Sequence, residues 1–257
     1  MFLGWDVGIP FILYALVSIV LIASYIYFIV FERVGFVGFK EKPSLEEIPP
    51  ALLLNRSSQE WWLWLTHPLE KIFLKRDVHP HTLGLISFFI TSFSLIGFSF
   101  GWFVLAGGCV LLGGTCGIFH KRLLKKQGLL TQNQTFLNFN LDLLGESLMF
   151  LGLLDHYTNT LFFYVVFIAF LSFILIHFSK IREEGLGITT KIPMLGRFER
   201  MIWIGISSIF SPLISAFANY FFPMSNTWLA SVGITIVAIL GAYSCYQWFD
   251  FVYKKLK

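Results

Sequence analysis

The sequence predicts an all-α integral membrane protein with about seven membrane-spanning helices. Hydrophobic residues make up 56% of the 257 residues and charged residues only 13%, and the mean hydropathy is +0.72. This composition excludes an ordinary soluble domain, because too few polar residues are present to cover its surface. Tryptophans recur near the ends of the apolar segments, as expected for side chains at a membrane interface.

Each spanning helix needs about 20 mostly apolar residues to cross the hydrocarbon core of a bilayer. The joints between the apolar runs are short and carry Gly, Pro, Asn or charged residues, which end helices. The first run is expected to be a retained helix, because it lacks the basic leader and the cleavage site of a signal peptide. The runs are 9–31, 82–100, 102–119, 136–154, 161–178, 201–221 and 227–251.

The Lys and Arg residues predict which helix ends face the cytoplasm. All 19 of them fall in alternate connections, and the connections in between contain none. Because basic residues gather on the cytoplasmic side, we expect an inner-membrane protein with its N-terminus outside and its C-terminus in the cytoplasm. The basic connections are 33–76, 121–126, 180–200 and 254–257.

The net charge of +4 does not indicate a nucleic-acid partner. The basic residues form short clusters that flank apolar segments, whereas nucleic-acid binding calls for a continuous basic patch or stripe. The expected partners are therefore phospholipids, with no nucleic acid.

The long connection after the first span contains a predicted surface helix. The run WWLWL begins at Trp61, and basic residues follow from Lys71 to Arg76. Apolar and aromatic side chains beside basic ones are typical of an amphipathic helix that lies on the inner leaflet. The predicted parts are an extra N-terminal transmembrane helix (1–32), a cytoplasmic linker with a juxtamembrane amphipathic helix (33–76) and a six-helix transmembrane core (77–257).

Two separated stretches resemble the CDP-alcohol phosphatidyltransferases, in particular the phosphatidylglycerophosphate and phosphatidylinositol phosphate synthases. The first begins GGTCGIFHKR at Gly113, where the family has D-x-x-D-G-x-x-A-R and then G-x-x-x-D-x-x-x-D. The second begins SKIREEGLG at Ser179 and continues to RFER at 197–200. The resemblance covers about residues 57–250. It implies a six-helix core behind a juxtamembrane helix, and weakly a homodimer.

The resemblance implies a metal site that this chain lacks in part. In the family, the four signature carboxylates bind divalent metal ions, and the last one is the base that acts on the acceptor hydroxyl. Here Gly113 and Cys116 stand at the first two positions, and neither supplies an oxygen ligand for magnesium or manganese. Asp142 and Glu146 stand at the third and fourth, with Glu146 at the degenerate catalytic base position. They share one helix face.

Two of four metal carboxylates are therefore missing. We expect a catalytically degenerate protein, a pseudoenzyme, that binds phospholipid or a partner membrane protein, the partner through the N-terminal helix. The alternative is an active phosphatidyltransferase with Mg²⁺ or Mn²⁺ at a divergent site, the one case in which a cofactor is expected. Asp142 and Glu146 then form a weak, incomplete metal site, or they pair with Lys121, Arg122 or Arg182. A third reading, an unrelated small transporter, is disfavoured because internal repeats are absent from the sequence.

The resemblance also implies binding positions for nucleotide and phosphate. Gly117 and Lys121 stand at the signature's glycine and arginine and are the nucleotide-binding candidates. The stretch 80–84 stands where the family has polar residues near the nucleotide, but His81 and Gly84 replace them. A guanidinium can bind a phosphate through two hydrogen bonds, although positive-inside bias alone explains the charge of this segment equally well. The phosphate- or headgroup-binding candidates are Arg182, Lys191, Arg197 and Arg200.

Overall fold

The computed structural model of the chain describes residues 16, 19–30, 56–75, 80–128, 131–186, 195–219 and 225–256. Within these residues every regular element is a helix, and six helices are long and apolar enough to cross a membrane. The predicted all-α core of six helices is confirmed. The helices are α3 (Pro80–Ser99), α4 (Phe103–Lys126), α5 (Gln132–His156), α6 (Phe162–Leu186), α7 (Arg197–Ala218) and α8 (Trp228–Leu256).

The extra N-terminal span is described only in part. Ile19–Val30 is helical and apolar, and at about 1.5 Å per residue it is too short to cross a bilayer by itself. The rest of the expected run 9–31, apart from residue 16, lies outside the described residues. The seventh span therefore stays a prediction.

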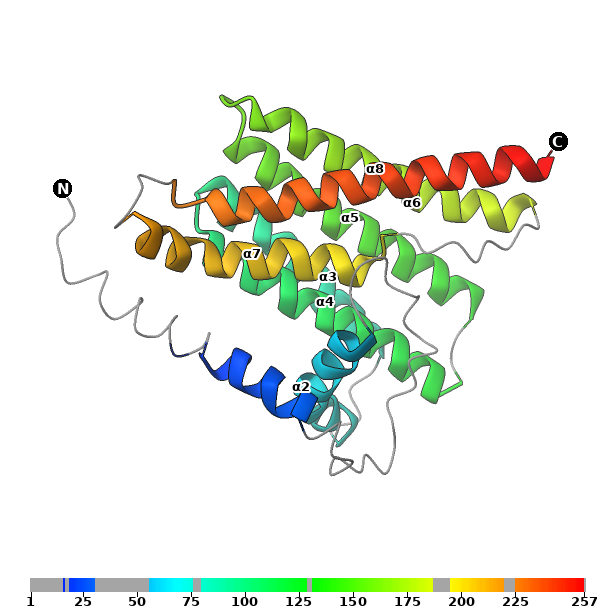
Figure 1. Cartoon of the computed structure of the whole chain (residues 1–257). Coiled ribbons are helices and arrows are strands. Elements are labelled where there is room, and N and C mark those ends of the chain that lie inside the picture. Colours follow the sequence, from blue (N-terminus) through cyan, green and yellow to red (C-terminus); the bar gives the residue numbers. More distant parts are fainter. Residues whose placement is uncertain are drawn as a thin grey trace.

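The six long helices form a closed ring of neighbours (Figure 1). α3 contacts α4 and α5, α4 contacts α7, α7 contacts α8, α8 contacts α6, and α6 returns to α5. The turn between α3 and α4 requires Gly101, whose φ of 75° is one that side chains disfavour. The largest buried cluster takes residues from all six helices, among them Phe150, Phe173 and Ile234.

Small residues allow the helices to approach closely inside this ring, as expected for packing in lipid. A Cβ added to Gly107 of α4 would lie 2.6 Å from the Gly205 carbonyl oxygen of α7. A Cβ on Gly113 would lie 3.0 Å from the Thr91 backbone nitrogen of α3. By contrast, Gly108 has no neighbour within 4 Å of its added Cβ. Helices of the core therefore approach each other closely at Gly107 and Gly113.

Gly152→Ala is expected to destabilise the protein by about 1–3 kcal/mol, as overpacking does. An added Cβ at Gly152 of α5 would lie 2.7 Å from Leu95 Cα of α3, a backbone atom that cannot turn aside. Gly145→Ala is the matched control, since Gly145 is on the same helix and its added Cβ would come no closer than 3.5 Å to a neighbour. The midpoint temperature of unfolding, followed in detergent by size-exclusion chromatography, should fall for Gly152→Ala alone. Equal midpoints would contradict this packing.

The predicted juxtamembrane helix is α2 (Arg56–Lys75), and it does not qualify as a span. One face of α2 packs on the core. Its Trp62 Nε1 donates to Thr115 Oγ1 of α4 at 3.2 Å, and Glu70 pairs with Arg122 of α4 at 3.1 Å. Its exposed face carries Lys71, which is compatible with the interfacial position that we predict. The helix is thus attached to the bundle by side-chain contacts as well as by its apolar face.

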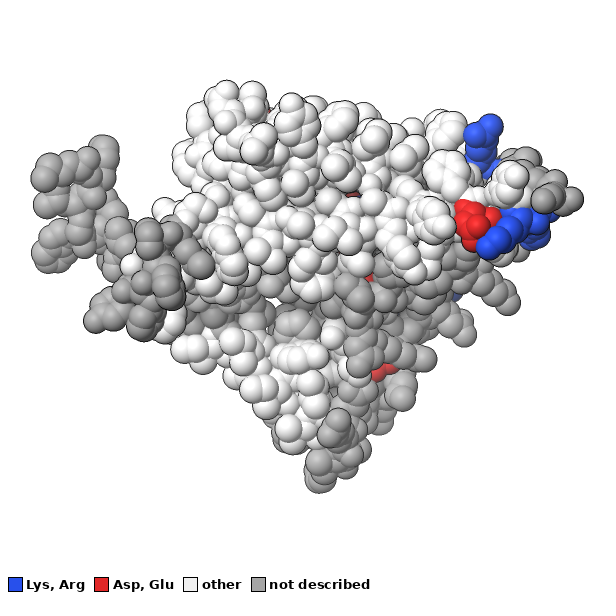
Figure 2. Space-filling view, turned by 45° about the horizontal axis from the view of Figure 1, so that its top comes forward, with Lys and Arg blue, Asp and Glu red and all other residues white. Residues whose placement is uncertain are grey.

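Charge and apolar surface are separated along the bundle. On the face in Figure 2, the charged side chains of the described residues gather mainly at one end. Near the end of α8, Asp250 and Lys254 form an exposed ion pair. Phe89 and Ile239 represent the apolar surface between the ends, at 65% and 63% exposed. This distribution fits a bundle that spans a membrane with its basic end on one side.

Candidate functional site

The two halves of the signature meet beside the start of α7. Arg197, in the first turn of α7, reaches both of them. A Cβ added to Gly117 of α4 would lie 2.9 Å from Arg197 Nη1. The same guanidinium forms ion pairs with Asp142 and Glu146 of α5. Residues from both stretches that carry the family resemblance therefore form one cluster.

Asp142 has two cationic partners in this cluster. Lys121 Nζ donates to Asp142 Oδ2 at 2.9 Å, and Arg197 pairs with Oδ1. The Asp142 side chain is 13% exposed, whereas that of Lys121 is 55% exposed. The pair with Lys121 is therefore the water-accessible and weaker of the two, because solvent screens it.

Glu146 is fully buried, and its carboxylate forms ion pairs with Arg197 and Arg200. Arg200 donates to Glu146 Oε2 from Nε at 3.0 Å and from Nη2 at 2.8 Å. Arg197 Nε lies 3.2 Å from Glu146 Oε1, close enough for an ion pair but not aligned as a hydrogen bond. A general base needs a lone pair that faces its substrate. Both oxygens of Glu146 face guanidinium groups, so the base position is occupied by an ion pair.

Arg200 is held in place from three sides. It is 2% exposed, its Nη1 donates to the Leu195 carbonyl at 2.8 Å, and its guanidinium carbon lies 4.9 Å from the centre of the Phe173 ring. Together with the two bonds to Glu146, these contacts satisfy a charge that would otherwise be costly to bury.

The phosphate candidates are divided by the structure. Arg197 and Arg200 lie in the cluster, on carboxylates of the chain itself. Arg182 is exposed near the end of α6, with its guanidinium carbon 6.0 Å from the centre of the Phe178 ring. Lys191 lies outside the described residues.

The nucleotide candidates lie beside side chains that fill the neighbouring space. At Gly117, the Ser87 hydroxyl would be 3.0 Å from an added Cβ. At Gly84 of α3, the buried imidazole of His120 would be 3.0 Å away. Lys121 is directed to Asp142. The nucleotide positions that the resemblance implies are thus bordered closely by the chain's own side chains.

No known sequence family and no curated protein sequence matches the chain. Crystal structures of Mycobacterium tuberculosis phosphatidylinositol phosphate synthase do match it. The form with manganese and citrate has 17% sequence identity and a TM-score of 0.59, over 73% of this chain and 88% of that one. The CDP-DAG-bound form has 18% identity and a TM-score of 0.59, over 73% and 93%. The apo form has 18% identity and a TM-score of 0.57, over 72% and 95%.

This chain has the CDP-alcohol phosphatidyltransferase fold. The fold expected from the two sequence stretches is therefore confirmed. In the cluster of this chain, the Arg197 guanidinium stands between the two halves of the signature.

The donors present do not fit the metal site that the CDP-alcohol phosphatidyltransferase fold implies. Magnesium and manganese require several oxygen ligands. Asp142 and Glu146 already have cationic partners, Gly113 has no side-chain donor, and the Cys116 thiol is a soft ligand. In the part of the chain that the structure describes, no three His, Cys, Asp or Glu side chains are grouped to hold a metal.

The expectation that the signature carboxylates pair with Lys121, Arg122 or Arg182 is confirmed for Lys121 and Asp142, whereas Glu146 pairs with Arg197 and Arg200. Arg122 Nη1 donates to Glu70 Oε2 of α2 at 3.1 Å, and both side chains are nearly buried. The reason is helix geometry. Adjacent residues point about 100° apart, so Lys121 and Arg122 cannot both face α5. Of the expected partners, only Lys121 pairs with Asp142.

Proposed function

We propose that the chain is a catalytically degenerate protein of CDP-alcohol phosphatidyltransferase fold that binds phospholipid in the cytoplasmic membrane. The observation that carries this proposal is the Arg197 guanidinium between Asp142 and Glu146. Phosphatidyl transfer from a CDP-activated lipid needs cations to neutralise the diphosphate, and hard cations need oxygen ligands. Here the remaining carboxylates neutralise arginines of the chain.

The charge of the cluster supports an anionic ligand. Two carboxylates, Asp142 and Glu146, face three cationic groups, Lys121, Arg197 and Arg200. The excess of one positive charge opposes a divalent cation and favours a phosphate. The Lys121 side chain is half exposed, so one cation of the cluster is accessible to a ligand. A phospholipid headgroup at this cluster fits both its charge and the membrane setting of the chain.

A partner membrane protein is the second candidate ligand, and a homodimer is one form of it. It is favoured by the apolar face of the N-terminal helix, where Ile19 and Ile26 are 65% and 56% exposed. Co-purification of two differently tagged copies of the chain tests for a homodimer. A search for a second protein in stoichiometric amount after mild solubilisation tests for a different partner. Recovery of the chain as a monomer with lipid alone would oppose it.

Turnover is the direct test of the proposed function. We expect no CMP release from the protein in vesicles that contain CDP-diacylglycerol, Mg²⁺ or Mn²⁺, and a panel of phosphorylated and free alcohols. The mycobacterial synthase in the same vesicles is the positive control. The Asp142→Asn, Glu146→Gln variant should match the unsubstituted chain at background level. CMP release that is lost in that variant would overturn the proposal and establish the alternative, an active transferase with a divergent metal site.

A further inference from the structure

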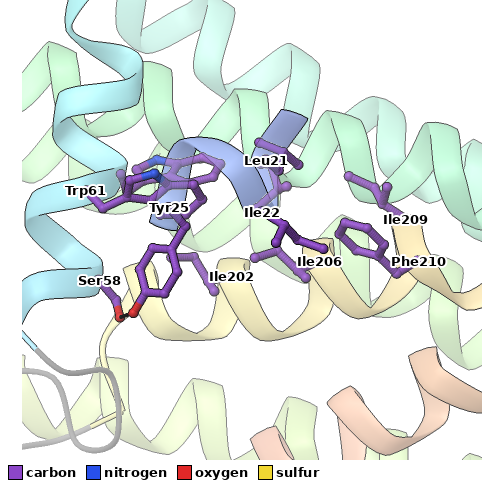
Figure 3. Close-up of a pocket in the computed structure, with 11 residues that line it drawn as sticks. Leu21, Ile22, Tyr25, Ser58, Trp61, Ile202, Ile206, Ile209 and Phe210 are labelled. Carbon is purple, nitrogen blue, oxygen red and sulfur yellow. Dashed lines mark hydrogen bonds between the residues drawn. The ribbon is translucent and has the colours of Figure 1, made fainter. Parts of the chain in front are cut away.

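An apolar pocket of about 330 Å³ lies between the N-terminal helix, α2, α4 and α7 (Figure 3). Small-molecule sites in proteins begin at about this size. None of the side chains around it is charged. The lining residues that the argument uses are Leu21 and Tyr25 of the N-terminal helix, Ser58 and Trp61 of α2, and Ile206 and Phe210 of α7.

The N-terminal helix forms one wall of this pocket and is held there by aromatic contacts. The Tyr25 hydroxyl lies 3.3 Å from the Ser58 hydroxyl, and the Tyr25 and Trp61 rings meet edge to face at 5.1 Å. Phe28 is buried, with its ring 5.8 Å from Trp64 of α2. The N-terminal helix, which precedes the six-helix core, therefore closes one side of the pocket.

The surface of the pocket is apolar along its length. Tyr25, Ser58 and Trp61 meet at the α2 side in Figure 3, while Phe210 lies at the other end along α7. The Trp61 indole N–H is buried, and no acceptor for it is found among the described residues. This N–H is buried behind the wall of the pocket, so the surface that a ligand meets is apolar.

The dimensions match one leaflet of a bilayer. The lining residues of α7 run from Ile202 to Phe210, which is about 12 Å along a helix axis. Half of the hydrocarbon core of a membrane is about 15 Å. Since α4 and α7 are both candidate spans, the space between them opens within the hydrocarbon, where acyl chains are the available ligand.

We infer that this pocket binds one acyl chain of a membrane lipid through apolar contacts. The chain extends along α7 toward Phe210. The inference rests on the proposed function only in that the protein binds lipid, and it holds whether or not the cluster at Arg197 is catalytic. The acyl chain can belong to a phospholipid or to a free fatty acid.

Photocrosslinking in vesicles tests the inference and separates these two sources. The protein is reconstituted with phosphatidylglycerol that carries a diazirine in mid-chain, or with a free fatty acid that carries the same group, and labelled peptides are identified by mass spectrometry. Labelling is expected on 202–210 of α7 and on Leu21 to Tyr25. Ile206→Trp fills the pocket and should abolish the labelling of these peptides. Ile239→Trp, on the exposed face of α8, should leave that labelling unchanged.

A second filling variant guards against misfolding of the first. Ile209→Trp also narrows the pocket and should reduce the labelling in the same way. Equal labelling of pocket peptides and of lipid-facing α6 and α8 peptides would overturn the pocket, as would unchanged labelling in Ile206→Trp. CMP release measured on the same vesicles would sink the proposed function and leave the pocket standing, so the two failures are distinguishable.

Discussion

Arg200→Met is expected to destabilise the protein by about 3–5 kcal/mol, the usual cost of removing one partner of a buried ion pair. The substitution leaves the Glu146 carboxylate, which is fully buried, without its two hydrogen bonds from Arg200. Arg197 cannot replace them, because its Nε is not aligned with the carboxylate. The Leu195 carbonyl loses its donor as well. The measurement is the amount of monodisperse protein that remains after heating in detergent.

Two further variants separate this ion pair from a general need for arginine. Arg182→Met removes an exposed arginine at the end of α6 and should leave the midpoint temperature unchanged. Adding Glu146→Gln to Arg200→Met removes the buried charge and should recover part of the loss, as a coupled pair requires. If Arg200→Met is as stable as Arg182→Met, the buried pair does not exist as described.

Gly113→Asp, which restores the first carboxylate of the family signature, is expected to prevent folding and not to restore metal binding. The added Cβ would point at the Thr91 hydroxyl and would lie 3.0 Å from the Thr91 nitrogen and 3.1 Å from the Ser87 carbonyl oxygen. Backbone atoms of α3 cannot yield as a flexible side chain can. A buried carboxylate would add its own desolvation cost. Overpacking alone amounts to about 1–3 kcal/mol.

The alanine variants separate size from charge in this prediction. Gly113→Ala should lower the midpoint temperature of unfolding, because the methyl group meets the same atoms of α3. Gly108→Ala, on the same helix with open space at its Cβ, should not. The readouts for Gly113→Asp are the yield of monodisperse protein and the binding of Mn²⁺ followed by its electron paramagnetic resonance signal. A folded Gly113→Asp protein that binds Mn²⁺ would contradict the packing of α4 on α3.

The six core helices could be predicted from the sequence because lipid leaves little choice. A chain in hydrocarbon must satisfy its backbone groups within each helix, so apolar runs between charged or Gly- and Pro-containing joints become spans. The ends were less predictable. α4 continues to Lys126 and α6 to Leu186, past the apolar runs that ended at 119 and 178, because charged residues extend a helix beyond the hydrocarbon.

The candidate cluster could be predicted as a set of residues but not as a set of pairs. The spacing of Asp142 and Glu146 placed both on one face of a helix, and α7 does bring Arg197 and Arg200 to that face. Nothing in the sequence indicated that these arginines, expected to receive a phosphate, would neutralise the carboxylates. That result depends on how α7 packs beside α4 and α5, which are distant from it in the sequence.

The sequence by itself determined the membrane class, the α-helical core and the loss of two signature carboxylates, since each depends on residue type and local spacing. Only the tertiary structure decided the use of Arg197, the ion pair that attaches α2 to α4 and the pocket beside Tyr25. These features arise where helices distant in sequence meet. Their side chains lie where electrostatic pairing and close packing are decided by a few tenths of an ångström, and no local pattern encodes those distances.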